Sequence, residues 1–474
     1  MKKYLQFLWI GAVFILLIRC SKDERSGTPD NNDTIPEVDT PLYQRHEEWS
    51  YNLGIYEVNI RQYTQEGTFE AFEAHLPRLK EMGVGILWLM PIHPIGEVNR
   101  LGSLGSYYSV KDYRDVNPEF GTMQQFKHLV NTVHDQGMFI IIDWVANHTS
   151  WDNYLTVDYP DFYNTDADGN FQPPPGTNWT DVIDLDYSNE DLRAYMIDAM
   201  KFWITETKID GFRCDAVSYV PSDFWREAIT QLKEENPGIF MLAENEGVNY
   251  HSQGWDMTYV WTLMGFDSGL IRQIYEGTKD AGDMGAYLQN EVNTYPASAY
   301  RMYFTSNHDE NSWHGTDFEQ LGESAEVFNV LTHTMNGMPL IYSGQESGLN
   351  KRLAFFDRDP IVWTSHPFEV LYTTLLKLKK ENKALWNGEA GGRPLRILTS
   401  ANDQIIAYYR EKEGDRLFAA LNLTAEEQIF TLEGDAFTGE YVNVFTDEAT
   451  SLSAEQELTL EAWDYLVLAK QAEE

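Results

Sequence analysis

Residues 139–148 have the sequence FIIIDWVANH, an apolar run that ends in polar side chains. Its first four positions are all apolar, which is typical of a parallel strand buried on both faces of a sheet. Similar runs recur between residues 54 and 346. The candidate strands are 54–60, 85–91, 139–145, 211–217, 240–246, 257–262, 302–309 and 338–346.

Stretches with the apolar spacing of helices lie between most of these strands. They cover 68–82, 123–136, 189–207, 222–235 and 324–336. Eight strands that alternate with helices predict an α/β fold of the (β/α)₈ barrel type. A doubly wound open sheet is the alternative, but no Gly-rich dinucleotide loop follows the first strand.

Two parts of the chain depart from this alternation. The segment at about 149–187 is rich in Asp, Asn, Pro and Tyr, and its length predicts a small inserted domain. After residue 385, short alternating segments separated by turn signals predict an antiparallel β-sandwich. We therefore expect the barrel at 47–385 and the sandwich at 386–474.

The N-terminus has the layout of a secretory signal. Lys2 and Lys3 precede an apolar run at 4–18, which is short for a membrane span of about 20 residues. The run ends at Cys20, and a cysteine in this place resembles the lipidation site of bacterial lipoproteins. An ordinary cleaved signal is the alternative. Residues 21–46 are polar and contain proline, which predicts a flexible tether.

These features predict a lipoprotein signal at 1–20 and an exported protein. It would be held at the outer membrane or cell surface by a lipid on Cys20, with the periplasmic side as the alternative. Cys214 is the only other cysteine, so we expect no intrachain disulfide in the mature protein. The formal charge of −39 argues against nucleic acid as a partner, because phosphates require a basic face.

Charged and polar side chains follow several of the predicted strands. In a barrel, the C-terminal ends of the strands converge on one site. Unpaired charges are costly to bury, so their presence beside apolar strands indicates function. The residues are Asp143, Asn147, His148, Arg213, Asp215, Glu244, Asn307, His308 and Asp309.

This set of side chains suits glycoside hydrolysis, in which one carboxylate attacks the sugar and another protonates the leaving oxygen. Arg213 lies two residues before Asp215, on the same face of its strand, and would keep Asp215 ionised. Apolar neighbours and nearby negative charge would make Glu244 retain its proton. Neutral histidines would donate hydrogen bonds to sugar hydroxyls.

Four segments resemble the short motifs of the α-amylase family of glycoside hydrolases. They are DWVANH at 143–148, GFRCDAV at 211–217, AENE at 243–246 and SNHDE at 306–310. The resemblance implies a catalytic barrel, an inserted B domain, a C-terminal β-sandwich and a retaining mechanism on α-glucosidic bonds. It also implies Asp215 as nucleophile, Glu244 as general acid/base and Asp309 as stabiliser of the transition state.

The same resemblance implies a substrate-binding set. Arg213, His148 and His308 match residues that orient the nucleophile and hold the sugar, and Asp143 belongs to the first motif. Tyr108, within GSYYSVKDY at 105–113, matches the aromatic platform under the cleaved ring. Glu246 is a second-ranked alternative for the acid.

Many family members also bind a structural Ca²⁺. Asn147 and Asp186 match two of its ligands, but Tyr219 stands where a histidine is common. A second family site, a D-x-N-x-D-G loop, is missing from NIRQYTQEG at 59–67. Ca²⁺ takes six to eight oxygen ligands, so we expect no required cofactor, with Ca²⁺ as the alternative.

The sequence thus predicts an enzyme that hydrolyses mainly α-1,4-glucosidic bonds in starch-type glucans or maltooligosaccharides. A 4-α-glucanotransferase or branching transglycosylase is the first alternative, because a covalent intermediate can pass to a sugar instead of water. A non-catalytic glycan-binding protein is the second. The presence of Asp215, Glu244 and Asp309 together disfavours the second alternative.

Overall fold

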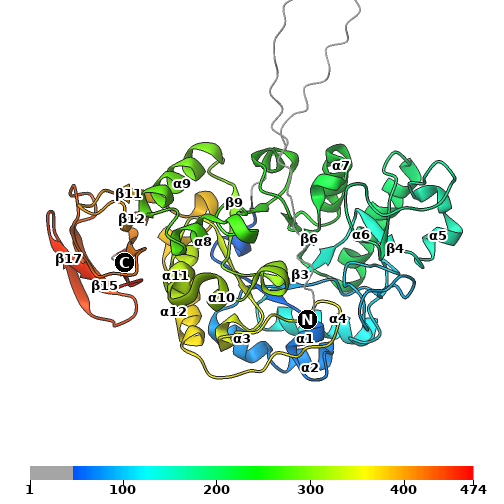
Figure 1. Ribbon diagram of the computed structural model, residues 1–474, viewed down its shortest axis with the longest axis horizontal. Coiled ribbons are helices and arrows are strands. Elements are labelled where there is room, and N and C mark those ends of the chain that lie inside the picture. Colours follow the sequence, from blue (N-terminus) through cyan, green and yellow to red (C-terminus); the bar gives the residue numbers. More distant parts are fainter. Residues whose placement is uncertain (1–45, 473–474) are drawn as a thin grey trace, which may run out of the picture. The chain divides into compact units, whose positions relative to one another are not determined.

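The computed structural model describes residues 46–472 (Figure 1). The predicted signal, Cys20 and nearly all of the predicted tether lie outside these residues. His46, which was placed at the end of the tether, instead belongs to the folded part. Its side chain is buried, with Nδ1 3.1 Å from Asp256 Oδ1 and Nε2 2.7 Å from Ser298 O.

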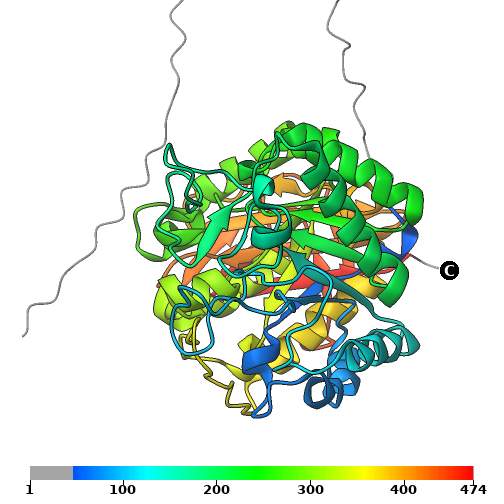
Figure 2. The same ribbon diagram turned by 90° about the vertical axis from the view of Figure 1, so that its right-hand side faces the viewer.

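Eight parallel strands form a closed barrel, as the sequence predicts, and helices surround it (Figure 2). The parallel pairing of Ile55 with Leu340 joins the first strand to the last and closes the barrel. In barrel order the strands are β1 (Ile55–Val58), β2 (Ile86–Leu89), β3 (Phe139–Trp144), β6 (Gly211–Cys214), β7 (Phe240–Ala243), β8 (Met257–Tyr259), β9 (Tyr300–Tyr303) and β10 (Met338–Tyr342).

The strands are shorter than predicted because their C-terminal polar residues leave the hydrogen-bonded ladder. The clearest case is the predicted strand at 302–309. It is the short strand β9 (Tyr300–Tyr303). Asn307 lies in the connection that follows, and His308 and Asp309 begin a helical turn that continues as a π-helix at Glu310–His314. These positions bring the polar side chains to the mouth of the barrel.

The predicted helix at 68–82 is divided into α2 (Phe69–Glu73) and α3 (Leu76–Met82). Pro77 explains the break, because proline lacks the N–H that would bind the carbonyl four residues earlier. The other helices of the barrel layer are α1 (Ile60–Tyr63), α4 (Met123–Asp135), α6 (Glu190–Thr207), α7 (Ser222–Glu235), α8 (Leu270–Tyr275), α9 (Ala281–Thr294), α10 (Asp317–Leu321), α11 (Ala325–Thr334) and α12 (Pro367–Glu381).

The predicted insertion between β3 and α6 is small and contains its own antiparallel pair of strands. Strand β4 (His148–Ser150) pairs with β5 (Val182–Asp184), and the short helix α5 (Leu155–Asp158) lies between them in sequence. The pairing matters for the site, since it begins at His148, where the polar end of the third barrel strand passes into the insertion.

The C-terminal part forms two antiparallel sheets, which confirms the predicted β architecture. The larger sheet has the order β11 (Leu395–Ile397), β12 (Ile405–Lys412), β13 (Asp415–Asn422), β18 (Tyr465–Lys470), β15 (Gly439–Asn443) and β16 (Ala449–Leu452). The smaller sheet pairs β14 (Gln428–Thr431) with β17 (Glu457–Leu460). Buried aromatic residues, including Phe418 and Phe430, form their shared core.

A buried arginine on β12 joins the larger sheet to the barrel. Arg410 donates hydrogen bonds to the carbonyl oxygens of Thr334 and Met335 at 3.0 and 2.6 Å. It also donates to Trp386 O at 3.0 Å and Gly392 O at 2.6 Å. Burial without a carboxylate partner lowers its pKa to about 9. The sheet and the end of α11 therefore share one hydrogen-bonded core.

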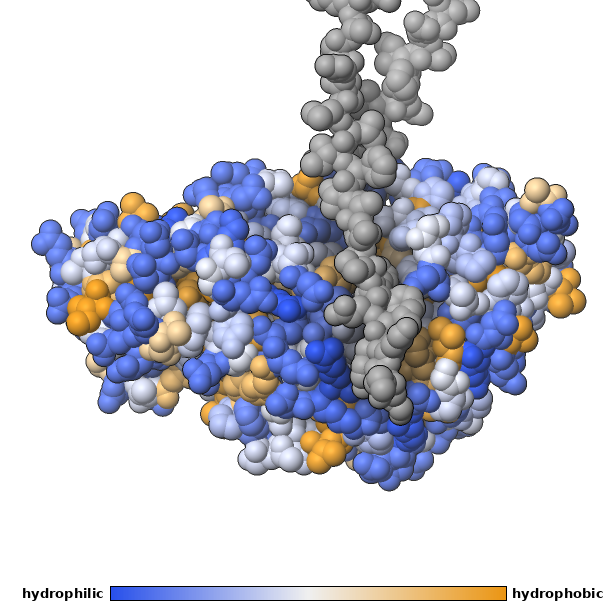
Figure 3. Space-filling view, viewed as in Figure 1, coloured by the Kyte–Doolittle hydropathy of each residue, from blue (hydrophilic) through white to orange (hydrophobic). Residues whose placement is uncertain are grey.

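The visible face of the molecule is mostly hydrophilic, with scattered apolar side chains (Figure 3). Among residues 46–472, no helix has the length and apolar character needed to span a bilayer.

Candidate active site

The polar ends of three neighbouring strands meet around one guanidinium group. Arg213, in β6, is fully buried, and its Nη1 lies 2.9 Å from both Asp143 Oδ1 and Asp215 Oδ1. Its Nη2 lies 3.0 Å from Glu244 Oε1. The barrel register sets this meeting, since Asp143 pairs with Arg213 and Cys214 pairs with Ala243. We call Asp143, Arg213, Asp215 and Glu244 the carboxylate cluster.

The other predicted residues join this cluster from loops. Tyr108 donates a hydrogen bond to Asp143 Oδ2 at 3.2 Å, and its hydroxyl lies 2.8 Å from His308 Nε2. The same His308 nitrogen is 3.4 Å from Asp309 Oδ2. His148 hydrogen-bonds to the main chain of Tyr108. All eight predicted catalytic and substrate-binding residues thus lie in one connected site.

Three residues of the site were missed by the sequence analysis. Glu57, in β1, is completely buried, with Oε1 2.5 Å from His308 Nδ1. Trp88 donates its indole N–H to Asp143 Oδ2 at 3.3 Å, and the Tyr259 hydroxyl accepts a hydrogen bond from Arg213 Nε at 3.1 Å. Glu57 carried a detectable signal, since it is a charged residue inside the first apolar run.

Burial dominates the electrostatics of the carboxylates. It raises the pKa of Glu244 to about 7, against the opposing effect of Arg213, and the charges of Asp215 and Asp309 raise it further. Burial also raises the pKa of Asp215 to about 6, although Arg213 favours its ionised form. Near neutral pH, Asp215 is therefore the more ionised group and Glu244 the more protonated one.

The two histidines differ in charge. Burial lowers the pKa of His148 to about 4, so this ring is neutral, as expected. Burial also acts to lower the pKa of His308, but the Asp309 and Glu57 carboxylates outweigh it and raise the value to about 9. The expectation of a neutral ring at His308 was wrong, because it did not include the buried carboxylate of Glu57.

Glu246, the alternative acid, has other partners. Its carboxylate accepts a hydrogen bond from Thr262 N at 2.9 Å and lies 3.2 Å from Arg301 Nη2. Arg301 in turn pairs with Glu291 at 2.8 Å. Among the described residues, the hydrogen bonds and ion pair of Glu246 go to Thr262, Tyr295 and Arg301 and not to the carboxylate cluster, which favours Glu244 for acid chemistry.

The two candidate Ca²⁺ ligands do not make a Ca²⁺ site by themselves. The Asn147 amide nitrogen lies 3.3 Å from His148 Nδ1, and Asp186 Oδ1 accepts a hydrogen bond from Ser188 N at 2.9 Å. Across residues 46–472, no group of three or more His, Cys, Asp or Glu side chains is arranged to hold a metal. Two side-chain oxygens fall short of the six to eight ligands that Ca²⁺ takes.

Family models cover both parts of the chain. The model for the α-amylase catalytic domain matches residues 30–382, and the model for the maltogenic amylase C-terminal domain matches residues 395–467. The first match alone spans more than half of the chain and includes the complete carboxylate cluster.

Similar proteins agree with these matches. α-Amylase MalA of Haloarcula japonica is 26% identical over 415 residues, and the alignment covers 83% of this chain but 59% of that protein. α-Amylase 3 of Dictyoglomus thermophilum is 25% identical over 469 residues, covering 84% of this chain and 89% of that protein. The structure of an α-amylase from Lactobacillus plantarum is 32% identical with a TM-score of 0.79, covering 89% of this chain and all of that one. The chain therefore belongs to the α-amylase family of glycoside hydrolases.

Proposed function

We propose that this protein hydrolyses mainly α-1,4-glucosidic bonds in starch-type glucans or maltooligosaccharides, with retention of the anomeric configuration. The observation that carries the proposal is the contact of one guanidinium group, that of Arg213, with both Asp215 and Glu244. Retaining glycosidases hold their two carboxyl groups about 5 Å apart, whereas inverting ones leave roughly 6.5–9.5 Å for a water molecule. Two carboxylates on one guanidinium favour the shorter separation.

In this mechanism the Asp215 carboxylate attacks the anomeric carbon while the Glu244 carboxyl group donates its proton to the departing glucosidic oxygen. A covalent glucosyl ester on Asp215 results. Glu244, now ionised, takes a proton from water as that water attacks the same carbon, which releases the sugar and regenerates both groups. Asp309 would interact with the positive charge that develops on the sugar ring.

Side-chain exposure separates the positioning residues of the site from those that can touch the sugar. Arg213 and Asp143 have no exposed side-chain surface, so they act as positioning residues beneath the site. This proposal replaces the substrate-binding role expected for both Asp143 and Arg213. Tyr108, His148 and His308 are assigned to the sugar in subsite −1. Glu57 is a further positioning residue, since it holds His308 charged with Nε2 directed to Tyr108 and Asp309.

Transfer of the glucosyl unit to another sugar is the first alternative. The relatives include an enzyme of Geobacillus stearothermophilus named cyclomaltodextrin glucanotransferase. It is 25% identical over 417 residues, and the alignment covers 56% of that enzyme. Hydrolysis is favoured by the relatives named α-amylase and by the match to a maltogenic amylase C-terminal domain. A non-catalytic role is disfavoured because all three carboxylates occupy one connected site.

The proposal is tested by product analysis on amylose, pullulan and maltotriose. We expect new reducing ends on amylose and an α-anomer as the first product by rapid NMR. Asp215→Ala should lower activity by several orders of magnitude, because no ester can form. The control is Asp198→Ala, which removes a largely exposed carboxylate on α6 that pairs with Arg114. A β-anomer, or near-normal turnover by Asp215→Ala, would contradict the mechanism. Larger glucans without new reducing ends would indicate transfer.

We also propose that the protein is exported and carries a lipid on Cys20, which would hold it at the outer membrane or cell surface close to polymeric substrate. The support is the sequence at 1–20, where a basic start and an apolar run precede the cysteine.

A further inference from the structure

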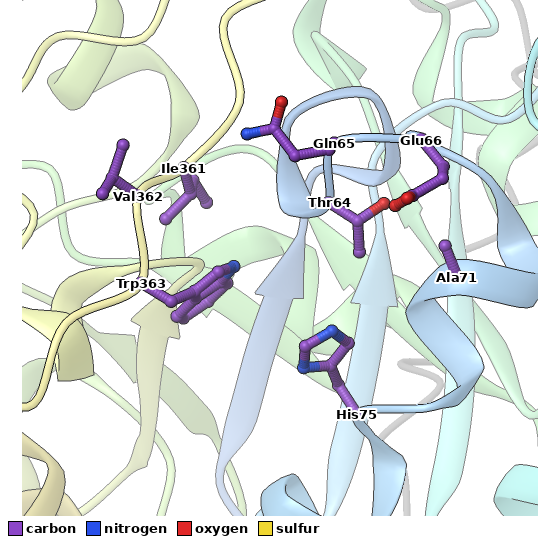
Figure 4. Close-up of a pocket in the computed structure, with 8 residues that line it drawn as sticks. All are labelled: Thr64, Gln65, Glu66, Ala71, His75, Ile361, Val362 and Trp363. Carbon is purple, nitrogen blue, oxygen red and sulfur yellow. The ribbon is translucent and has the colours of Figure 1, made fainter.

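A pocket of about 540 Å³ lies outside the carboxylate cluster. It is formed by the turn after α1, by α2 and by the segment that leads into α12 (Figure 4). We call it the Trp363 pocket. Its lining residues are Thr64, Gln65, Glu66, Ala71, His75, Ile361, Val362 and Trp363. The volume is within the range of about 300–1,000 Å³ that is usual for small-molecule sites.

The aromatic part of this pocket is held rigidly. The indole N–H of Trp363 donates a hydrogen bond to Tyr63 O at 2.8 Å, and the Arg78 guanidinium packs against the ring at 4.9 Å. Arg78 is itself fixed by Glu346 at 2.9 Å. The His75 ring lies 6.2 Å from the Trp363 ring, at an angle of 28°. A ligand thus meets a preformed aromatic surface and loses little affinity to ordering it.

Polar groups without partners border this surface. Within residues 46–472, no hydrogen bond or salt bridge engages the side chains of Gln65, Glu66 or His75, although the charges of Arg78 and Glu66 act on the His75 ring. Burial, followed by the Arg78 charge, lowers the pKa of His75 below its ordinary value, so the ring is neutral at pH 7. The amide, the carboxylate and the imidazole together offer both donors and acceptors.

The pocket's charge excludes several ligand classes. Glu66 and the overall charge of −39 disfavour phosphates and acidic peptides. Both nearby cations have partners, because Arg78 pairs with Glu346 and Arg358 donates to the carbonyl oxygens of Thr64 and Gln65. A purely apolar ligand would remove water from the amide and carboxylate without replacing its hydrogen bonds, which is costly. A neutral ring with an apolar face and hydroxyl groups at its edge satisfies both parts of the pocket.

We propose that the Trp363 pocket is a second binding site for glucosyl residues of an α-glucan chain, which it holds without cleaving. The inference rests on the proposed function, because that function supplies the ligand. The Trp363 ring contacts the apolar face of the sugar, while Gln65, Glu66 and His75 bind its hydroxyls. A glucan held here remains close to the protein between cleavage events.

The test uses the full chain carrying Glu244→Gln, titrated calorimetrically with maltoheptaose. We expect two classes of site. Adding Trp363→Ala should weaken one class by about tenfold, equivalent to about 1.4 kcal/mol, and leave the other unchanged. The double variant Gln65→Ala/His75→Ala keeps the hydrogen bond from Trp363 to Tyr63 O and should weaken the same class of site. It therefore tests the pocket even if Trp363→Ala fails to fold. Ile429→Ala removes an exposed apolar side chain of β14 and serves as the control.

Activity provides a second measurement. With Glu244 intact, Trp363→Ala should raise KM for amylose severalfold, while kcat/KM on a short activated aryl maltoside stays unchanged. A single class of maltoheptaose sites that neither pocket variant affects would overturn the inference but leave the proposed function standing. If no site binds maltoheptaose and amylose is not cleaved, the proposed function fails together with the inference.

Discussion

The pH dependence of activity should follow from the two carboxyl groups held by Arg213. Asp215 must be ionised to attack and Glu244 protonated to donate, and their pKa values are about 6 and about 7. The rate should therefore describe a bell with a maximum near pH 6.5. At its ordinary pKa of 4.5, only roughly 1 in 300 Glu244 side chains would be protonated at pH 7. The raised value makes that fraction about one half.

Glu244→Gln tests this assignment. On amylose, kcat/KM should fall by about 10²–10⁴, the usual contribution of a positioned general acid. On an aryl glucoside with a good leaving group it should recover substantially, because forming the ester then needs no proton donor. The variant's profile should keep the acidic limb near pH 6 and lose the alkaline limb near pH 7. Glu246→Gln, the matched control, should keep both limbs. An alkaline limb that persists in Glu244→Gln would refute the reasoning.

The same substitution should change stability in a direction opposite to activity. The folded protein holds the Glu244 proton up to pH about 7, whereas the unfolded chain releases it near 4.5. The folded state therefore binds more protons between these values, and its stability falls as pH rises through this window, by about 3 kcal/mol. Glu244→Gln removes this loss. Its melting temperature should match the wild type below pH 4.5 and exceed it above pH 7, and a lower value at pH 8 would contradict the burial argument.

Three further predictions concern parts outside the carboxylate cluster. Arg410→Ala should lower the free energy of unfolding by about 3 kcal/mol or more, since it leaves buried carbonyls without donors, and calorimetry measures this; an unchanged melting temperature would contradict it. EDTA should shift the melting temperature little, because Asn147 and Asp186 alone fall short of a Ca²⁺ ligand set; a saturated site would contribute a few kcal/mol, so a large drop restored by Ca²⁺ would establish a metal site. Cys20→Ala should move the protein from the membrane fraction to the soluble fraction at unchanged specific activity; a wild type already soluble and starting well past residue 20 would exclude the anchor.

The sequence predicted the barrel well because strands buried on both faces leave unbroken apolar runs, such as that at 139–142. It predicted the site because a charge beside such a run, as at Asp143, Arg213 and Glu244, is conspicuous. Helix boundaries were harder. The break between α2 and α3 depends on the local backbone effect of Pro77, which the apolar spacing of 68–82 does not reveal.

Other features depend on closure of the barrel. Glu57 and His308 are 251 residues apart, and only the pairing of β1 with β10 brings the first strand next to the loops of the last ones. The charge of His308 therefore could not be predicted from its own motif. The Trp363 pocket has a similar origin, since residues 64–75 and 361–363 carry no shared pattern and meet only in the folded molecule.

The hydrogen bonds of Arg410 affect how this protein could be recombined with its relatives. A crossover between α12 and β11 would take Arg410 from one parent and the carbonyls of Thr334 and Met335 from the other. It would also cut a structured linker, which holds 3-10 turns at Lys383–Leu385 and Gly388–Ala390. A sheet taken from a relative would need an arginine at the position of Arg410. Otherwise the barrel would need another donor for the carbonyl oxygens at the end of α11. The unit that can be exchanged intact is thus the barrel together with its sheet. A chimaera joined at that linker would leave buried carbonyl oxygens without hydrogen-bond donors at the interface.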